Sequence, residues 1–380
     1  MKITYVSQAR FPTEKAHGHQ IAQVCQAMVR LGHSVTLIAP SIKTGVTEDF
    51  KTYYSLTNPF SFVRIKVFDA LSAWFVPGAL AFHVTMFSYR RALQRFFASH
   101  GADLLYTRSS ALLSALLRTR LPVILELHTL PRRTQSFVDR CNRCRRIVCL
   151  TTIMQSELRS WGVERALCTV EGDAVDLSLF HSNVSCSEAR REFPVRSSRP
   201  VVGYIGRLNT MDMEKGVADL LRSLSLLKTE HHLFHGFIVG GPSIDQEKYR
   251  LLARRLDLHD DDVTFLDPVP HKSVPQVMAA CDILAMPFPD LPHYHSNMSP
   301  LKMFEYMTAF RPIVTSDLPS IRDVLDETTA FFFPPGDIRA LADTLVMMAS
   351  HPSESLARAQ AAKERVQHYS WEKRMGRILV

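Results

Sequence analysis

One short segment near the C-terminal end of the chain could bind a phosphate and a sugar ring attached to it. Residues 299–302 read Ser-Pro-Leu-Lys, and Glu305 follows soon after. Ser299 is typical of a helix N-cap and Pro300 of a first helical position, so we expect a helix to begin here, with free N–H groups that favour an anion. Glu305 could then accept hydrogen bonds from ribose hydroxyl groups. An ordinary capped helix with one apolar, core-facing side explains the same residues equally well.

Glycines and basic residues follow two apolar runs in the same half of the chain. Gly206 and Arg207 come directly after one run, Lys215 follows past a short loop, and Gly240 ends a second run. An arginine and a lysine that converge could neutralise a diphosphate, and a glycine allows a ligand to approach the backbone closely. Two alternatives remain open: the Gly-Arg pair could simply form a turn, and Lys215 could be a solvated surface charge.

Short apolar runs that alternate with helical patterns predict the elements that position these residues. Strands are expected in the first half at 2–6, 34–39, 103–106, 122–126 and 147–150, with helices near 18–31, 109–118 and 153–160. Strands are expected in the second half at 201–206, 237–240, 263–266, 282–286 and 313–315. This alternation predicts parallel sheets covered on both faces. The fold class is therefore α/β, with two tandem, doubly wound Rossmann-like domains whose ligands bind beyond the carboxyl ends of the strands.

The length of the chain also indicates two domains. A chain of 380 residues exceeds one average hydrophobic core. The stretch at about 182–200 contains Ser and Arg, has few apolar residues and ends at a proline, which is typical of a hinge. We therefore predict a first domain over 1–183 and a second over 184–365.

Composition predicts a globular, cytoplasmic protein. Hydrophobic residues make up 46% and charged residues 22%, no run of eighteen apolar residues occurs, and the first residues read as a strand and not as a leader. The seven cysteines are scattered. Cys141 and Cys144 have no second pair at zinc spacing, so we expect reduced thiols and no metal.

A formal net charge of +8 favours an acidic partner or surface. Nucleic acid is not expected, because no basic stripe accompanies a recognised nucleic-acid module. From Trp74 to Phe97, aromatic residues alternate with arginines at helical spacing, which suits a helix in an anionic bilayer interface. The alternative is that Trp74, Phe82 and Phe96 belong to the core and that the arginines form a solvated rim. We hypothesise an enzyme attached peripherally to the inner face of the cell membrane.

Several segments occur in the order and spacing of one enzyme family. They are Tyr204-Ile205-Gly206-Arg207-Leu208 with Lys215-Gly216, Val269-Pro270, Ala280-Cys281-Asp282-Ile283-Leu284, the Ser-Pro-Leu-Lys segment with Glu305, and Pro319-Ser320-Ile321-Arg322-Asp323-Val324. Together they resemble the retaining family-four glycosyltransferases of the GT-B fold over nearly the whole chain. The resemblance implies two Rossmann-like domains that face a cleft, with the acceptor in the first and the nucleotide-sugar donor in the second. It also implies a C-terminal helix, at about 366–380, that returns to the first domain.

The resemblance implies roles for three catalytic candidates and one glycine. Arg207 and Lys215 match the basic pair that binds the donor diphosphate and stabilises the charge on the leaving nucleotide. His128 follows a predicted strand and matches the active-site histidine near the transferred sugar. Gly18 matches a glycine that lies near the donor phosphates and the acceptor.

Further donor-binding residues follow from the same resemblance. Glu305 matches the second glutamate of a paired-glutamate signature and would hold the ribose hydroxyl groups. The backbone of Ser299, Pro300, Leu301 and Lys302 would receive the distal phosphate. Val269 and Pro270 would present backbone groups to the base. Gly206 and Gly240, whose missing side chains allow a ligand to approach closely, complete the set of donor-binding candidates.

One residue departs from the family pattern. Asn297 stands where the first glutamate of the signature, eight positions before Glu305, would contact the donor hexose. An asparagine can donate and accept hydrogen bonds but has no charge. The departure leaves open which sugar is transferred and how active the protein is.

The sequence therefore predicts a glycosyltransferase that moves a sugar from a UDP- or GDP-linked donor to an acceptor hydroxyl group, with retention of configuration. No cofactor or metal is expected, because two cations and a helix terminus can replace a metal. No Asp-x-Asp of the metal-dependent glycosyltransferase type is identified. The acceptor would be a glycan or a lipid-linked sugar in glycolipid or cell-surface polysaccharide biosynthesis. A nucleotide-sugar epimerase and a non-catalytic sugar-nucleotide-binding scaffold remain alternatives. A nicotinamide-dependent dehydrogenase is disfavoured, because the loop at 8–19 lacks the glycine spacing of a dinucleotide fingerprint.

Overall fold

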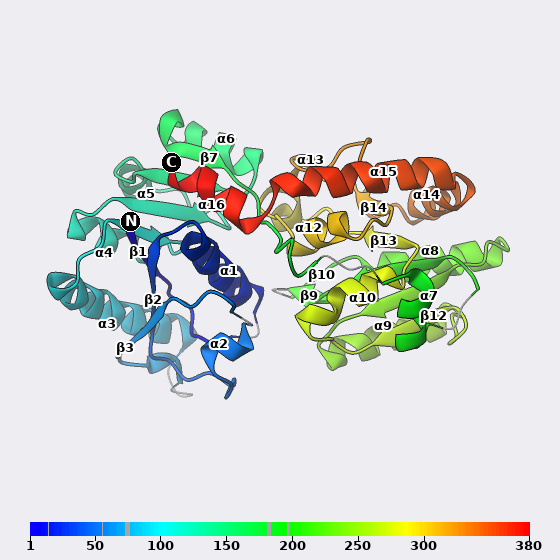
Figure 1. The fold of residues 1–380 in the computed structure, drawn as a ribbon, viewed down its shortest axis with the longest axis horizontal. Helices are drawn as coiled ribbons and strands as arrows, with labels where there is room; N and C mark the ends of the chain where they lie inside the picture. Colours follow the sequence, from blue (N-terminus) through cyan, green and yellow to red (C-terminus); the bar gives the residue numbers. More distant parts are fainter. Residues whose placement is uncertain (14, 55, 73–76, 181–183, 196–197, 211) are drawn as a thin grey trace. The chain divides into compact units, whose positions relative to one another are not determined.

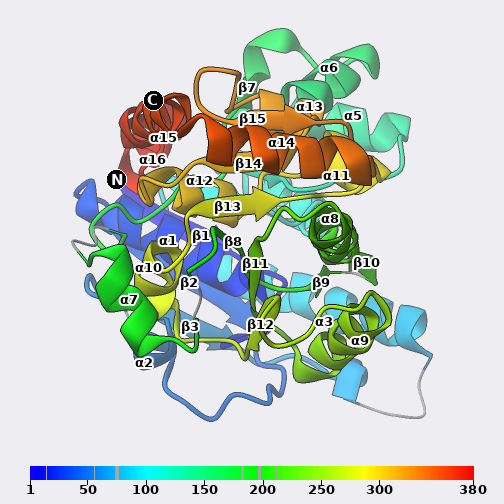
Figure 2. The ribbon, with the colours of Figure 1, turned by 90° about the vertical axis from the view of Figure 1, so that its right-hand side faces the viewer.

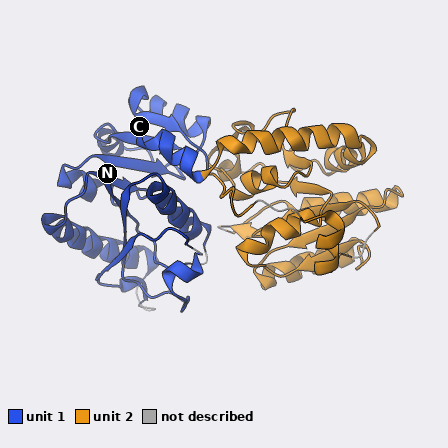
Figure 3. Ribbon diagram, viewed as in Figure 1, with its two compact units in different colours: residues 1–173, 371–380 blue, residues 174–370 orange. Residues whose placement is uncertain are grey.

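The computed structural model describes all residues except 14, 55, 73–76, 181–183, 196–197 and 211, and it divides into two compact units (Figure 3). Unit 1 contains Met1–Asp173 and Trp371–Val380, and unit 2 contains Ala174–Ser370. Each unit has a parallel sheet with helices around it (Figure 1). The predicted α/β class with two Rossmann-like domains is confirmed.

The described part of unit 1 has a parallel sheet with the strand order β3-β2-β1-β4-β5-β6-β7. Its strands are β1 (Lys2–Val6), β2 (Ser34–Pro40), β3 (Ser61–Ile65), β4 (Leu104–Thr107), β5 (Val123–Leu127), β6 (Arg146–Cys149) and β7 (Cys168–Val170). Its helices are α1 (Ala16–Arg30), α2 (Phe50–Tyr53), α3 (Gly78–Ser99), α4 (Leu113–Leu116), α5 (Gln135–Cys141), α6 (Thr152–Ser160) and α16 (Trp371–Leu379). The order reverses between β1 and β4, which is where ligands bind in such sheets.

The last helix of the chain, α16, packs against α1, the first. Arg30 on α1 donates to Glu372 on α16 at 2.6 Å. Arg374 on α16 is only 1% exposed, so this helix is a part of the interior of unit 1 and not a surface appendage. The predicted return of the C-terminal helix to the first domain agrees with this packing.

The described part of unit 2 has a parallel sheet with the strand order β12-β11-β8-β13-β14-β15 and a small antiparallel hairpin. The strands are β8 (Val201–Ile205), β11 (His235–Val239), β12 (Val263–Leu266), β13 (Ile283–Met286), β14 (Ile313–Ser316) and β15 (Phe331–Phe333), with β9 (Asn209–Thr210) and β10 (Met213–Glu214) in the hairpin. The helices are α7 (Cys186–Glu192), α8 (Val217–Thr229), α9 (Ser243–Arg255), α10 (Val274–Ala279), α11 (Pro292–Ser296), α12 (Leu301–Thr308), α13 (Pro319–Arg322), α14 (Ile338–Ser350) and α15 (Pro352–Arg365).

The sheet of unit 2 is buried on both faces, as a parallel sheet requires. Alternate residues of β8 point to opposite sides: Val202 and Tyr204 join a core with α8, α9 and α14, while Val201 and Ile205 join a core with α10 and α12. Figure 2 shows α7 and α10 on one side of β11 and β12, with α8 and α9 on the other. The carboxyl ends of the strands are therefore held by two packed layers of helices.

The predicted boundary between the domains is wrong. The compact units divide after residue 173 and again after 370, whereas we expected a break at 183 and a returning helix from about 366. Val175 donates its N–H to the carbonyl of Tyr369 at 3.0 Å, so both crossing segments pair within unit 2. The predicted hinge contains α7, capped by Ser185 and Glu188, with Ala189 in the core. Charged residues on its solvent face made this helix resemble a linker.

No helix in the described ranges is long and apolar enough to cross a bilayer.

Candidate functional site

The glycines that end two neighbouring strands of unit 2 lie against each other. β8 and β11 pair in parallel, so their carboxyl ends meet at one edge of the sheet, beside the reversal of strand order between β8 and β13. Gly206 has a φ of 136° and Gly240 a φ of 146°. A Cβ on Gly240 would lie 1.9 Å from the carbonyl oxygen of Gly206. We call this pair the glycine junction; both positions require glycine.

A buried lysine from α12 points to this junction. Lys302 is 7% exposed, and its Nζ would lie 3.2 Å from a Cβ placed on Gly206. The ammonium lies 3.4 Å from the ring centroid of Tyr204, a cation–π contact, but has no hydrogen-bond acceptor among the described residues. Burial and the charge of Lys215 lower the pKa of Lys302 well below its ordinary value. An anion at the junction would supply the missing partner.

Two further cations lie at the same edge. Arg207 follows the junction and is exposed to solvent. Lys215 precedes Gly216, the N-cap of α8, where a Cβ would lie 1.5 Å from the carbonyl oxygen of Pro287 after β13. This close approach fixes the start of α8 against the end of β13. Burial and the charge of Arg207 lower the pKa of Lys215 to about 8. The structure thus brings the predicted arginine and lysine into one electrostatic cluster with a third cation, Lys302.

The predicted start of the phosphate-binding helix is wrong by one residue. α12 begins at Leu301, with Pro300 in extended conformation at the N-cap and Ser299 before it. The carbonyl of Pro300 accepts from Met303 at 3.0 Å, which closes the first turn there. The N–H groups of Leu301 and Lys302 still stand at the helix start, where an α-helix offers them no acceptor of its own. The anion-favouring end is therefore retained, shifted by one position.

Glu305 lies partly buried on α12 and has a partner that the sequence analysis missed. Nε2 of His271 lies 2.9 Å from a carboxylate oxygen of Glu305, and the two atoms share a hydrogen bond. Burial favours the neutral ring, but the hydrogen bond and charge of Glu305 raise the pKa of His271 above its ordinary value. His271 directly follows Val269 and Pro270, so this contact brings the predicted base-binding segment to the predicted ribose-binding carboxylate. The position of His271 directly after the Val-Pro pair is the sequence feature that could have identified it as a site residue.

Asn297 follows the short helix α11 as its C-cap, and its backbone N–H donates to His293 at 3.0 Å. In the described part of the chain, its side-chain amide has no hydrogen-bond partner. Its contact with a donor hexose stays a prediction.

The remaining predicted site residues lie in unit 1. His128 follows β5, at the carboxyl edge of the sheet, and its side chain is 18% exposed. Its Nε2 lies 2.6 Å from the fully buried carboxylate of Glu126, a partner that the strand pattern alone concealed. Gly18 is in the first turn of α1, where a Cβ would lie 2.3 Å from the hydroxyl of Tyr54. Close packing explains this glycine, and its contact with a ligand stays a prediction.

Glu126, His128 and Asp173 offer ligand atoms within 4.8 Å of one another, a spacing that a metal could use. However, the guanidinium of Arg374 already lies 3.1 Å from the Glu126 carboxylate. Because that guanidinium supplies the positive charge, a metal ion would have to displace it. The donor set therefore fits a buried ion pair better than a metal centre.

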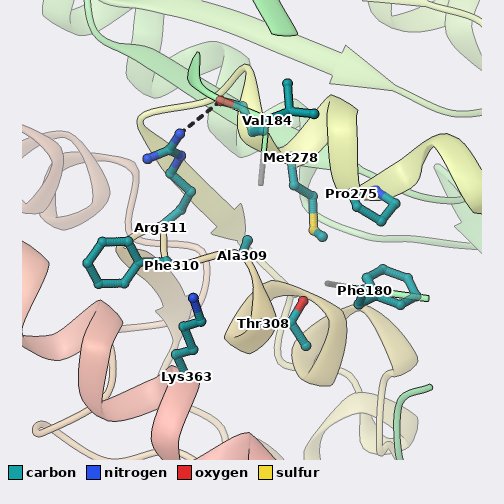
Figure 4. Close-up of a pocket in the computed structure, with 10 residues that line it drawn as sticks. Phe180, Val184, Pro275, Met278, Thr308, Ala309, Phe310, Arg311 and Lys363 are labelled. Atoms are coloured by element: carbon teal, nitrogen blue, oxygen red, sulfur yellow. Dashed lines mark hydrogen bonds between the residues drawn. The ribbon is translucent and has the colours of Figure 1, made fainter. Parts of the chain in front are cut away.

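A separate hollow in unit 2 lies at the opposite end of α12 from the cation cluster (Figure 4). Phe180, Met278 and Phe310 line it with Arg311 and Lys363. The guanidinium of Arg311 donates to the carbonyl of Ala279 at 3.0 Å, so it is committed to the backbone. None of the predicted donor-binding residues lines this hollow.

Two family models match the chain, one in each half. The model described as "Glycosyltransferase Family 4" matches residues 18–179, and the model described as "Glycosyl transferases group 1" matches residues 199–351. The first match lies mostly in unit 1 and ends a few residues into unit 2, and the second lies within unit 2.

Curated relatives and solved structures agree with these models. A D-inositol 3-phosphate glycosyltransferase of Kribbella flavida is 27% identical over 56% of this chain and 50% of its own length. A 2-deoxystreptamine N-acetyl-D-glucosaminyltransferase of Streptomyces fradiae is 30% identical over 52% of this chain and 46% of its own length. The chain thus matches about half the length of these relatives.

The structure of Anabaena Alr3699/HepE in complex with UDP-glucose superposes with a TM-score of 0.73 and 19% identity, covering 100% of this chain and 99% of that one. At this level of identity, the likeness shows a common fold. With family models matching in both units, the chain belongs to the family 4, or group 1, glycosyltransferases and has the GT-B fold.

Proposed function

We propose that the protein transfers a sugar from a nucleotide diphosphate donor to an acceptor hydroxyl group, with retention of configuration. The main support is the buried ammonium of Lys302, which faces the glycine junction without an acceptor among the described residues. Arg207 and Lys215 lie in the same electrostatic cluster. Three cations at the start of a helix suit a diphosphate, which has several negative charges.

The groups around the cluster suit the rest of a nucleotide. Glu305 could accept hydrogen bonds from the ribose hydroxyl groups, and its contact with His271 orients the carboxylate. The segment at Val269 and Pro270 would contact the base. The complex of Anabaena Alr3699/HepE with UDP-glucose supports a uridine donor, and a guanosine donor is the alternative.

The same cations would assist the reaction itself. When the bond between the sugar and the diphosphate breaks, negative charge grows on the leaving phosphate. Fixed positive groups that face this charge stabilise the transition state more than the ground state. Arg207, Lys215 and the start of α12 would perform this role without a metal ion. The acceptor hydroxyl would attack on the face that the diphosphate leaves.

We further propose an acceptor at a membrane surface, a glycan or lipid-linked sugar in glycolipid or polysaccharide biosynthesis. Leu80, Val84 and Phe87 on α3 are exposed by 55%, 37% and 57% and lie at helical spacing on one side. The guanidinium of Arg91 lies 4.9 Å from the Phe87 ring centroid. Apolar and basic groups side by side suit an anionic bilayer interface. We call Leu80, Val84, Phe87 and Arg91 the α3 patch.

Other residues of the predicted membrane segment do not belong to this patch. Phe82 and Phe96 are half-buried and pack against the core of unit 1, as the alternative interpretation expected. Trp74 lies outside the described residues.

The overall proposal predicts that UDP or GDP is released from a matching nucleotide sugar only when an acceptor is present. Incubation of the protein with each donor, with and without a cytoplasmic membrane extract as a source of acceptors, would be followed by mass spectrometry. An epimerase would convert the donor sugar without any acceptor. A scaffold would bind the donor and leave it intact, and either result would contradict transfer.

Replacing Lys302 by methionine should weaken UDP binding and stabilise the protein without ligand. A lost charge-assisted hydrogen bond to phosphate costs about 1.5–3 kcal/mol, which raises Kd by roughly ten- to a hundredfold. Removal of a buried, unpaired ammonium should increase the unfolding free energy by about 1 kcal/mol or more. Titration calorimetry and thermal unfolding measure the two effects. Lys248→Met, at an exposed lysine of α9, should change neither. If Lys302→Met binds UDP as tightly as the parent, the assignment of this ammonium to the donor site is wrong.

Raising the pH should weaken UDP binding, because Lys215 loses its proton with a pKa of about 8. We expect Kd to rise between about pH 7 and 9. Above the pKa of Lys215, each further pH unit should increase Kd by up to about tenfold. The increase in Kd should be shallower in Lys215→Arg, whose charge does not titrate in this range.

The free energy of unfolding without ligand should increase as the pH rises. Since the unfolded lysine has a pKa of about 10.4, the folded state gains stability as the pH rises from about 8 to 10.4. A pH-independent Kd in the parent would contradict the assignment.

The α3 patch should bind anionic vesicles. In flotation with phosphatidylglycerol-containing liposomes at low salt, we expect the parent protein to float and Leu80→Ser/Phe87→Ser to stay at the bottom. Ile244→Ser, at a 72% exposed side chain of α9, is the matched control and should float like the parent. A parent protein that remains in the bottom fraction would refute membrane attachment.

A further inference from the structure

Unit 1 contains a buried ionic network that the proposed donor site does not use. Glu126 on β5 has no exposed surface, and Arg374 on α16 is 1% exposed. The two carboxylate oxygens of Glu126 lie 3.1 and 3.3 Å from the two terminal nitrogens of Arg374. A buried carboxylate is stable only when a cation and hydrogen-bond donors surround it. The last helix of the chain thus supplies the counter-charge for a strand in the middle of the first sheet.

The surroundings of Glu126 make it an acceptor on every side. Gln20 on α1 donates to Oε1 at 2.7 Å, and the hydroxyl of Tyr106 on β4 donates to Oε2. Burial alone would raise the pKa of Glu126, but Arg374 and the hydrogen bond from His128 hold it well below its ordinary value. The carboxylate is therefore ionised and has no proton to donate.

This determines which nitrogen of His128 has the hydrogen. Nε2 lies 2.6 Å from Oε1 of Glu126, and an ionised carboxylate can only accept, so Nε2 must be the donor. Burial and the charge of Arg108, moderated by Glu126, lower the pKa of His128 to about 4, so the ring is neutral near pH 7. A neutral ring with hydrogen on Nε2 leaves Nδ1 as an acceptor. In the described part of the chain, Nδ1 has no hydrogen-bond partner.

We propose that Arg374 is a positioning residue that acts through Glu126 to hold His128 in its Nε2–H form. The Nδ1 atom then offers a lone pair to a hydroxyl group of the acceptor glycan or lipid-linked sugar. This inference rests on the proposed function for the identity of the ligand. The tautomer itself can be tested without any substrate. Arg374 does not contact the ligand; its effect passes through one carboxylate.

The tautomer of His128 can be read from ¹⁵N–¹H correlation spectra of protein labelled at histidine, with His128→Gln used to assign the signals. We expect the parent to show one neutral ring with hydrogen on Nε2 at about pH 7. In Arg374→Met, Glu126 loses its cation and takes up a proton, and its hydroxyl then donates to Nε2. The ring should change to the Nδ1–H form, with loss of at least tenfold in transfer rate. Arg374→Lys retains a cation and should retain the parent tautomer.

If Arg374→Met fails to fold, Glu126→Gln/Arg374→Met removes both charges together and should show a mixture of tautomers. The matched control is Glu171→Gln/Arg377→Met, which removes a neighbouring ion pair between the same helix and the segment after β7. This control should keep the parent tautomer and the parent rate. A His128 ring that is Nδ1-protonated or charged in the parent would overturn the proposal. So would an unchanged tautomer in both Arg374→Met and the double variant.

Nucleotide binding separates this proposal from the proposed function. UDP affinity depends on unit 2 and should be the same in the parent and in every variant of Glu126 and Arg374. Absence of UDP and GDP binding in the parent would refute the donor assignment and leave the tautomer result standing.

Discussion

A buried ammonium needs hydrogen-bond acceptors, and in unit 2 no described residue accepts a hydrogen bond from Lys302. The carboxylate of Glu305 acts on it only through its charge. The features around Lys302 are those that an anion-binding position would require. The glycine junction has no side chain between its backbone and the ammonium, the start of α12 adds N–H groups, and Lys215 adds a second cation. Such an arrangement costs stability in the empty protein. Under the proposed function, anion binding accounts for its presence.

The two units handle a buried charge in opposite ways. In unit 1, Glu126 receives donors from four side chains, and Arg374 neutralises it completely within the protein. In unit 2, Lys302 faces an aromatic ring and has no hydrogen-bond acceptor among the described residues. The first arrangement rigidifies its surroundings, because both carboxylate oxygens of Glu126 accept hydrogen bonds. Under our two proposals, the first arrangement holds the ring of His128 in one tautomer, and the second gains its hydrogen-bond acceptor when an anion binds.

Much of the fold could be predicted because the central strands are short, apolar and separated by helices. The edge strands β3, β7 and β15 were missed, since they have three to five residues and weak patterns. The start of α12 was predicted one residue early, because Ser299 and Pro300 fit the N-cap and N1 as well as the two positions before the helix. The contact of His271 with Glu305 and that of Arg374 with Glu126 join segments far apart in the sequence. Periodicity within one segment has no information about such contacts.

The position of Arg374 has a consequence for how the protein folds during translation. During translation, β1 to β7 leave the ribosome long before α16, and nearly two hundred residues of unit 2 separate them. Until α16 emerges, the nascent sheet contains Glu126 without its counter-charge. The amino-terminal half therefore cannot mature as an independent cotranslational intermediate of full stability. Prematurely terminated chains should be recognised by proteases as incomplete, which links quality control to the final helix.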